Sequence, residues 1–228
     1  MFWCYGTSKR WISCAKAFTA SRLLGSSASR FAGVWALPQG GCTAFGQVEI
    51  LLIIHTIMNY TVIENVLTMQ ELDAINRVVL GYDFPWFYHP SDTHDSQGLP
   101  FMCHTLVHRD ESYTPVEGTV NSQSYEFFKT IFDRICPDRT VLRASLNLTF
   151  HNPAEHGSIH VDHEFEHNNL IIYLSHTSAG TILYDQNHKQ IDCTPSEYNT
   201  AVQFAGLPHA QQLCAPGETR LVVVFTYI

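Results

Sequence analysis

The sequence has little positive charge for its size, and that charge is unevenly placed. Its 228 residues hold 13 Lys and Arg against 21 Asp and Glu, a formal net charge of −8. Residues 1–57 carry a net charge of +4, so the rest of the chain carries −12. Binding a nucleic-acid backbone needs clustered Lys and Arg. The acidic balance of the main part of the chain therefore argues against a nucleic-acid partner.

The chain also lacks a Cys-x-x-Cys pair and a long apolar run. Its 7 cysteines stand singly, which is typical of free thiols in a reducing compartment and not of a disulfide framework. The longest apolar run, residues 48–58, contains Glu49 and His55 and is shorter than the roughly 20 residues of a membrane-spanning helix. We therefore expect an intracellular, cytoplasmic protein with no membrane span.

The first 57 residues contain one acid, Glu49, among scattered Lys and Arg and many Ser and Ala. That composition is typical of an organelle transit peptide, which would place the protein in mitochondria. A translated upstream region is an equal alternative, because a cleaner sequence begins at Met58. Under both interpretations we expect residues 1–57 to be a poorly ordered extension outside the fold.

Residues 58–140 are predicted to supply helical support and a long loop. Thr68 and Glu71 have the spacing of a capping box ahead of an apolar stripe, which predicts a helix over residues 68–83. A second helix is predicted over residues 122–136. Residues 83–121 are rich in Pro, Gly, His and aromatic residues with little periodicity, and we expect this stretch to cover the functional site.

From Val141 onward, eight short strand-like runs follow one another, separated by turn formers such as "NPAEHG" and "APGE". Many short strands without intervening helices are typical of a jelly roll or barrel. The predicted fold class is mainly β with supporting helices: a double-stranded β-helix (jelly-roll) core over residues 141–228, preceded by the α-helical part. Residues 58–228 are expected to form one domain.

Three side chains in this region have the pattern of a metal site. His160 and Asp162 lie two residues apart in "SIHVDHE", and in a strand both would point to the same face. His209 follows 49 residues later and opens a late strand. Two histidines and one carboxylate match the facial triad of non-heme Fe(II) oxygenases, which leaves open coordination positions. A structural zinc site would need four filled positions.

An arginine in an apolar strand adds a second signal. Arg220 lies in "TRLVVVFTYI", where alternation places it on the same face as Val222 and Val224. Burial of an unpaired guanidinium is costly, so a bound carboxylate held by two hydrogen bonds would explain it. The alternative is a strand-end arginine in solvent or paired with Glu218.

The order His-x-Asp, Tyr-Leu, Gly, Pro-His and Arg resembles the 2-oxoglutarate- and Fe(II)-dependent dioxygenases, and specifically their prolyl 4-hydroxylase-like branch. The resemblance implies that His160, Asp162 and His209 hold Fe(II) and that Arg220 binds the distal carboxylate of 2-oxoglutarate. Tyr173 matches a tyrosine that shares this contact in part of the family. A further family tyrosine near the cosubstrate is replaced here by Phe150 or His151.

The function implied by this resemblance is hydroxylation of a protein side chain (prolyl-type) or of a small molecule. O₂ and 2-oxoglutarate would be consumed, succinate and CO₂ released, and ascorbate used as a reductant. Two alternatives stay open: a cupin-like barrel metalloprotein that does not use 2-oxoglutarate, and a non-enzymatic jelly-roll binding module. Arg220 disfavours the first because a cupin needs no buried cation there. The spacing of the triad disfavours the second.

Overall fold

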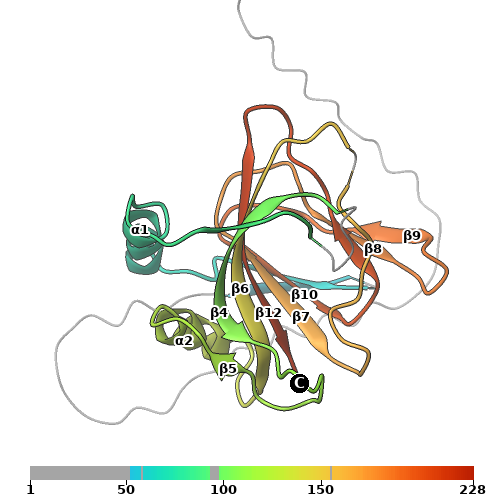
Figure 1. The fold of residues 1–228 in the computed structure, drawn as a ribbon, viewed down its shortest axis with the longest axis horizontal. Coiled ribbons are helices and arrows are strands. Elements are labelled where there is room, and N and C mark those ends of the chain that lie inside the picture. The colour runs from blue at the N-terminus through green and yellow to red at the C-terminus, as the bar shows by residue number, and fades with distance from the viewer. Residues whose placement is uncertain (1–51, 58, 93–97, 155) are drawn as a thin grey trace, which may run out of the picture. The chain divides into compact units, whose positions relative to one another are not determined.

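The computed structural model describes residues 52–57, 59–92, 98–154 and 156–228, which form two antiparallel sheets and two helices (Figure 1). The larger sheet consists, in spatial order, of β1 (Ile53–Thr56), β2 (Thr61–Glu64), β10 (Thr200–Ala205), β7 (Asn168–Tyr173), β12 (Thr219–Tyr227), β6 (Val141–Phe150), β4 (Phe101–His108) and β3 (Phe87–His89), with β5 (Thr119–Val120) paired to β4. The smaller sheet has the order β11 (His209–Gln211), β8 (Thr181–Tyr184), β9 (Gln190–Cys193).

The two faces of the larger sheet have different partners because side chains alternate along each strand. On one face, Ile172 and Phe225 pack against helices α1 (Met69–Val78) and α2 (Tyr125–Ile135) in the main hydrophobic core. On the other face, Tyr173 and Val222 pack with Leu183 of the smaller sheet. Figure 1 shows the helices on one side of the larger sheet and β8 and β9 on the other. The predicted fold class, mainly β with supporting helices, is confirmed.

Helix α1 begins as the sequence predicts. The Thr68 hydroxyl accepts a hydrogen bond from the Glu71 N–H at 3.1 Å, and the Glu71 carboxylate accepts one from the Thr68 N–H at 2.8 Å. This reciprocal capping box satisfies two backbone donors that a helix start would otherwise leave unpaired. Leu72 and Ile75 then bury the apolar face of the helix.

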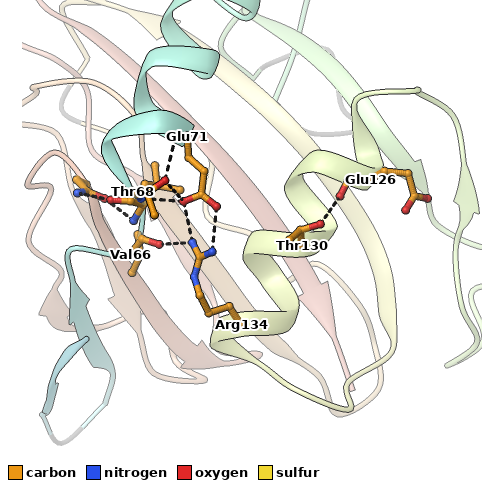
Figure 2. A network of polar contacts seen from close by, with 8 residues as sticks. Val66, Thr68, Glu71, Glu126, Thr130 and Arg134 are labelled. Carbon is orange, nitrogen blue, oxygen red and sulfur yellow. Dashed lines mark hydrogen bonds and ion pairs between the residues drawn. The ribbon is translucent and has the colours of Figure 1, made fainter. Parts of the chain in front are cut away.

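The same glutamate joins the two helices. Arg134 of α2 donates to both Glu71 carboxylate oxygens, at 2.9 and 3.0 Å, and to the backbone carbonyl of Val66 at 2.6 Å (Figure 2). Burial alone would raise the pKa of Glu71, but the hydrogen bonds from Arg134 and Thr68 outweigh it and hold the pKa below its ordinary 4.5. The helix pair is therefore fastened by a two-pronged ion pair.

Helix α2, predicted over residues 122–136, spans Tyr125–Ile135 and buries one apolar face. Phe128, Ile131 and Phe132 are almost completely buried, whereas Phe127 and Ile135 are only partly buried against the core. The side chain of the N-cap residue Ser124 makes no capping hydrogen bond.

Seven of the eight strand-like runs after Val141 are strands in the structure, and the exception is the run that holds His160 and Asp162. Residues 157–164 form no strand there, only an isolated antiparallel bridge between His160 and His209. Val161, between the two candidate ligands, is 43% exposed, so this segment lacks the covered face that stabilises a strand.

Two stretches before Val141 contain strands that the sequence did not predict. β1 lies inside residues 1–57, which were expected to stay outside the fold; residues 1–51 lie outside the described part of the chain. β3, β4 and β5 lie inside the expected loop 83–121. β4 was not predicted because the polar residue His104 interrupts its apolar pattern. His104 is nevertheless buried, because its two ring nitrogens have partners in the Pro85 carbonyl and the Ser122 hydroxyl.

No helix in the described part of the chain is long and apolar enough to cross a membrane.

Candidate metal centre

His160, Asp162 and His209 lie together at one end of the space between the two sheets. One potential ligand atom from each lies within 4.8 Å of the others. His160 and His209 are held side by side by the isolated bridge, in which each backbone N–H donates to the other residue's carbonyl, at 3.0 and 2.9 Å. The bridge brings the two histidines together, and the chain bends at Asp162, two residues after His160. The predicted alternation along a strand is not the cause.

Both imidazoles are oriented by backbone carbonyls. Nδ1 of His160 lies 3.0 Å from the Ser158 carbonyl oxygen, and Nδ1 of His209 lies 2.9 Å from that of Leu207. A carbonyl oxygen only accepts hydrogen bonds, so each Nδ1 donates, and each Nε2 is the ring nitrogen left to face a metal ion. Metal-binding histidines are commonly fixed in this way.

The two carboxylate oxygens of Asp162 have different surroundings. Its Oδ1 accepts a hydrogen bond from Nη1 of Arg143 at 3.0 Å. Its Oδ2 is buried and has no hydrogen-bond partner among the described residues. Burial alone would raise the pKa of Asp162, but the nearby His209 and Arg143 hold it well below the ordinary value. The carboxylate is therefore ionised at neutral pH.

The contact between Asp162 and His209 is one that a bound cation would stabilise. Oδ2 of Asp162 lies 3.4 Å from Nε2 of His209. Burial lowers the pKa of His209 to about 4, although Asp162 opposes the shift, so the imidazole is neutral at pH 7. Two lone pairs then face each other in a buried place with no proton between them. A cation bound between the two atoms would satisfy both, and these protonation states are the ones that metal binding requires.

A cavity of about 350 Å³ extends from the three residues along the facing strands. Arg220 lines it and is 4% exposed. Its Nε donates to the Ala179 carbonyl at 3.1 Å and its Nη2 to the Thr181 hydroxyl at 3.1 Å. In the described residues its Nη1 has no hydrogen-bond partner and the guanidinium has no ion pair.

Arg220 is neither paired with Glu218 nor exposed to solvent, which were the two alternatives for this residue. Glu218 accepts hydrogen bonds from the backbone N–H and the hydroxyl of Ser178, at 2.9 and 2.7 Å. Arg220 is buried and therefore not in solvent. Thr149 lies opposite it in the β6–β12 ladder, and the Thr149 hydroxyl is also buried without a hydrogen-bond partner in the described structure. A buried cation beside an unpaired hydroxyl is a suitable place for a carboxylate.

Tyr173 is fully buried, and it lies beneath Arg220 instead of lining the cavity. Its hydroxyl is 3.2 Å from both the Thr181 and the Thr194 hydroxyl oxygens, and the Arg220 guanidinium carbon lies 5.4 Å from its ring centre. The structure therefore gives Tyr173 a contact with the arginine. Its predicted contact with a cosubstrate stays a prediction.

The two positions considered for a further cosubstrate contact lie elsewhere. Phe150 is 50% exposed and His151 bonds through Nδ1 to the Cys214 carbonyl; both line a different, smaller cavity. Asn147, on the same strand, lines the main cavity, and its side-chain oxygen is buried without a partner in the described part of the chain.

Part of the stretch 83–121, which was expected to cover the functional site, lines the cavity. His89, Phe101, Cys103 and Thr105 line the cavity from β3 and β4. Trp86, however, is partly buried against the main core and donates to the Val79 carbonyl, on the helical side.

Two arginines beside the candidate centre were missed by the sequence analysis. Arg143 binds Asp162 Oδ1, and Nη1 of Arg109 donates to the Asp162 backbone carbonyl at 2.9 Å. A signal existed for Arg143, because it alternates with Ser145 and Asn147 in β6 and so shares their face. His163, by contrast, stays away from the centre, with Nε2 2.8 Å from the Thr226 hydroxyl.

No family model and no curated protein matches the sequence. Solved structures do match. An oxidoreductase of the 2OG-Fe(II) oxygenase family from Burkholderia pseudomallei is similar, with a TM-score of 0.57, 12% identity, and coverage of 74% of this chain and 84% of that one. OsALKBH1 is also similar, with a TM-score of 0.53, 12% identity, and coverage of 76% and 99%.

A third similar structure is a prolyl hydroxylase from Trichoplax adhaerens, solved in complex with a peptide fragment of the hypoxia inducible factor oxygen degradation domain. It has a TM-score of 0.51 and 10% identity, and the match covers 75% of this chain and 83% of that one. These matches confirm that the described chain has the jelly-roll fold found in 2-oxoglutarate- and Fe(II)-dependent oxygenases.

Proposed function

We propose that the protein is a non-heme Fe(II)- and 2-oxoglutarate-dependent dioxygenase that hydroxylates a small molecule or a protein side chain of the prolyl type. The observation that carries the proposal is the buried, unpartnered Oδ2 of Asp162, which faces the free Nε2 of His209 at 3.4 Å. His160 completes a facial set of two imidazoles and one carboxylate, the ligand set of this enzyme class.

The position of Arg220 supports 2-oxoglutarate as the cosubstrate. It is a buried cation without an acidic partner among the described residues, and it lines the same cavity as the three candidate ligands. A dicarboxylic keto acid held by a metal at one end and by a guanidinium at the other fits this arrangement. A cupin-like metalloprotein would leave Arg220 without a role.

Within this proposal each residue has a defined task. His160, Asp162 and His209 would hold Fe(II), and their backbone and Arg143 contacts keep the ligand atoms in place before the metal binds. O₂ would be the oxidant, activated at Fe(II), and 2-oxoglutarate would supply two electrons by oxidative decarboxylation to succinate and CO₂, so that one oxygen atom would enter succinate and the other a substrate C–H bond, with ascorbate as a reductant. Arg220, supported by the ring of Tyr173, would orient the cosubstrate.

The proposal is tested by loading the metal-free full chain with Fe(II) under anaerobic conditions and measuring bound iron. The wild type should bind one iron per chain, and addition of O₂ and 2-oxoglutarate with a panel of substrates should yield succinate. Asp162→Asn keeps the shape of the side chain but removes the charge, and should abolish both results.

Asp138→Asn is the matched control for Asp162→Asn. Asp138 is exposed and has a φ of 58°, a conformation that asparagine tolerates, so this variant should behave as the wild type. Iron binding that survives unchanged in Asp162→Asn would refute the proposed function.

A further inference from the structure

Two guanidinium groups lie beside the candidate metal centre, on the side away from Arg220. Arg109 follows directly after β4, and Arg143 is the third residue of β6. Both line the main cavity, and both donate one hydrogen bond to Asp162, at 2.9 and 3.0 Å. The proposed reaction assigns neither of them a contact with substrate.

The charges around these two arginines are not balanced. Arg109 has no ion pair with any described residue: its partner at Asp162 is a backbone carbonyl, and its guanidinium carbon lies 5.7 Å from the Tyr113 ring centre. Burial, and then repulsion from Arg143, lowers the pKa of Arg109 despite the attraction of Asp162. An arginine stays protonated even so, and two cations therefore lie close together and partly out of water.

The acids of the cavity do not neutralise this pair. In the described structure Asp92 forms no ion pair with either arginine; its carboxylate accepts hydrogen bonds from the Leu99 N–H and from both the N–H and the hydroxyl of Ser158, at 3.0 Å each. Asp162 would share its negative charge with a metal ion. No other carboxylate among the described residues lines the cavity. The cavity wall at Arg109 and Arg143 therefore has an excess of positive charge.

This positive wall is separate from the proposed cosubstrate site. In the β6–β12 ladder Arg143 lies opposite Thr226, whereas Arg220 lies opposite Thr149. The two ladder positions are six residues apart on β6, which at roughly 3.3 Å per residue is about 20 Å between backbone positions. A 2-oxoglutarate molecule held at Arg220 would therefore not reach the other two guanidinium groups, of which Arg143 is paired with Asp162 and Arg109 has no ion pair with a described residue.

We infer that Arg109 and Arg143 bind the carboxylate of a small-molecule substrate next to the metal centre. The inference rests on the proposed function and makes it more specific: the compound hydroxylated would be a small carboxylic acid. The fork of N–H donors on a guanidinium matches the two oxygens of a carboxylate. Within the described residues each of these groups forms one hydrogen bond, so most of their donors have no partner there.

Size and charge favour a small molecule over a macromolecule. The cavity of about 350 Å³ lies near the lower end of the range for ligand sites, roughly 300–1,000 Å³, and 2-oxoglutarate would fill part of it. The net charge of −8 repels a nucleic acid or an acidic peptide, which carries many negative charges, more strongly than a small acid that carries one. The two arginines lie in the cavity wall and act at short range, so they favour an anion small enough to enter the cavity.

The test compares acids with their uncharged amides on the Fe(II)- and 2-oxoglutarate-loaded full chain, without O₂, by isothermal titration calorimetry. The probes are benzoate and benzamide, and propionate and propionamide. Loss of a charge-assisted pair costs roughly a factor of ten or more in affinity, so the wild type should bind each acid at least about tenfold more tightly than its amide. Equal affinities for acid and amide would overturn the inference.

Variants assign the preference to the two arginines. Arg109→Gln, which can still donate to the Asp162 carbonyl, should lower the acid-to-amide ratio, and the double variant with Arg143→Gln should abolish it. Arg109→Lys, which keeps the charge, should retain part of the ratio. Arg139→Gln, at an exposed position, is the matched control and should retain all of it. A ratio that persists in the double variant would overturn the inference.

Two further measurements separate this inference from its alternatives. If Arg109 only positioned Asp162, Arg109→Gln would change iron content or 2-oxoglutarate affinity and leave the acid-to-amide ratio as it was. If the wild type fails to bind iron or 2-oxoglutarate, the proposed function fails. The anion site is then tested by the same titrations on the metal-free Arg220→Met variant, in which the other buried cation of the cavity is absent.

Discussion

Replacing Arg220 with methionine should remove the recognition of one carboxylate and leave the metal centre intact. Arg220 is 4% exposed, and its free Nη1 and the remaining N–H of Nη2 are available for a two-pronged contact. Hydrogen bonds to charged groups contribute about 1.5–3 kcal/mol each. Two of them make about 3 kcal/mol or more, which corresponds to a loss of roughly 100-fold or more in 2-oxoglutarate affinity.

The assay is anaerobic calorimetric titration of the Fe(II)-loaded protein with 2-oxoglutarate and with 2-oxopentanoate, which has the same keto acid end but no distal carboxylate. The wild type should bind 2-oxopentanoate about 100-fold more weakly than 2-oxoglutarate. Arg220→Met should bind both compounds with similar, weak affinity, because the partner of the distal carboxylate is gone. Iron content, measured in parallel, should be unchanged.

This cycle of two proteins and two ligands isolates the interaction of one guanidinium with one carboxylate. A loss of affinity equal for both ligands would mean that the substitution acts on the keto acid end or on the fold. Retention of the full preference for 2-oxoglutarate in Arg220→Met would refute the assigned role. Arg220→Lys, which keeps a charge but not the fork, should fall between the two.

Three further substitutions have outcomes that follow from the packing. Phe132→Ala removes a fully buried ring that contacts two aromatic side chains of β12, and should cost about 3–5 kcal/mol in urea unfolding, whereas Phe150→Ala at a half-exposed position should cost far less. Glu71→Gln should cost about 1–2 kcal/mol at pH 7. Because the folded pKa of Glu71 is lowered, its contribution is present above pH 4.5 and is lost on acidification, so stability curves of wild type and variant should converge in acid. Tyr173→Phe should leave 2-oxoglutarate affinity within about twofold if the tyrosine acts only through its ring on Arg220, and a loss of about tenfold would instead indicate direct contact.

The strands after Val141 could be predicted because their apolar alternation reflects burial on one or both faces. The exception, residues 157–164, shows the limit of this reasoning. The segment has an alternating pattern, yet it forms one bridge at His160 and a bend at Asp162 in place of a strand. The order and spacing of the candidate ligands were readable, whereas the geometry that joins them depends on pairing with a residue 49 positions away.

Other features depend on contacts that no local pattern encodes. β4 could not be predicted because a histidine in an apolar run usually argues against burial. His104 is buried because both ring nitrogens are hydrogen-bonded to residues distant in the sequence. β1 has four exposed residues and exists through its pairing with β2. Arg109 becomes relevant only because the chain folds back to bring its guanidinium to the Asp162 carbonyl. The role of such a polar group depends on its partners, and only the folded structure identifies them.

The reciprocal backbone bonds between His160 and His209 also bear on how the protein would acquire and lose its ion. These bonds, with the carbonyls that hold the imidazole rings and the two arginines that hold Asp162, position all three candidate ligands through contacts within the protein. A chelator should therefore strip the centre of an intact, folded protein, and a mismetallated preparation should be recoverable by simple exchange. Refolding would not be needed for reactivation.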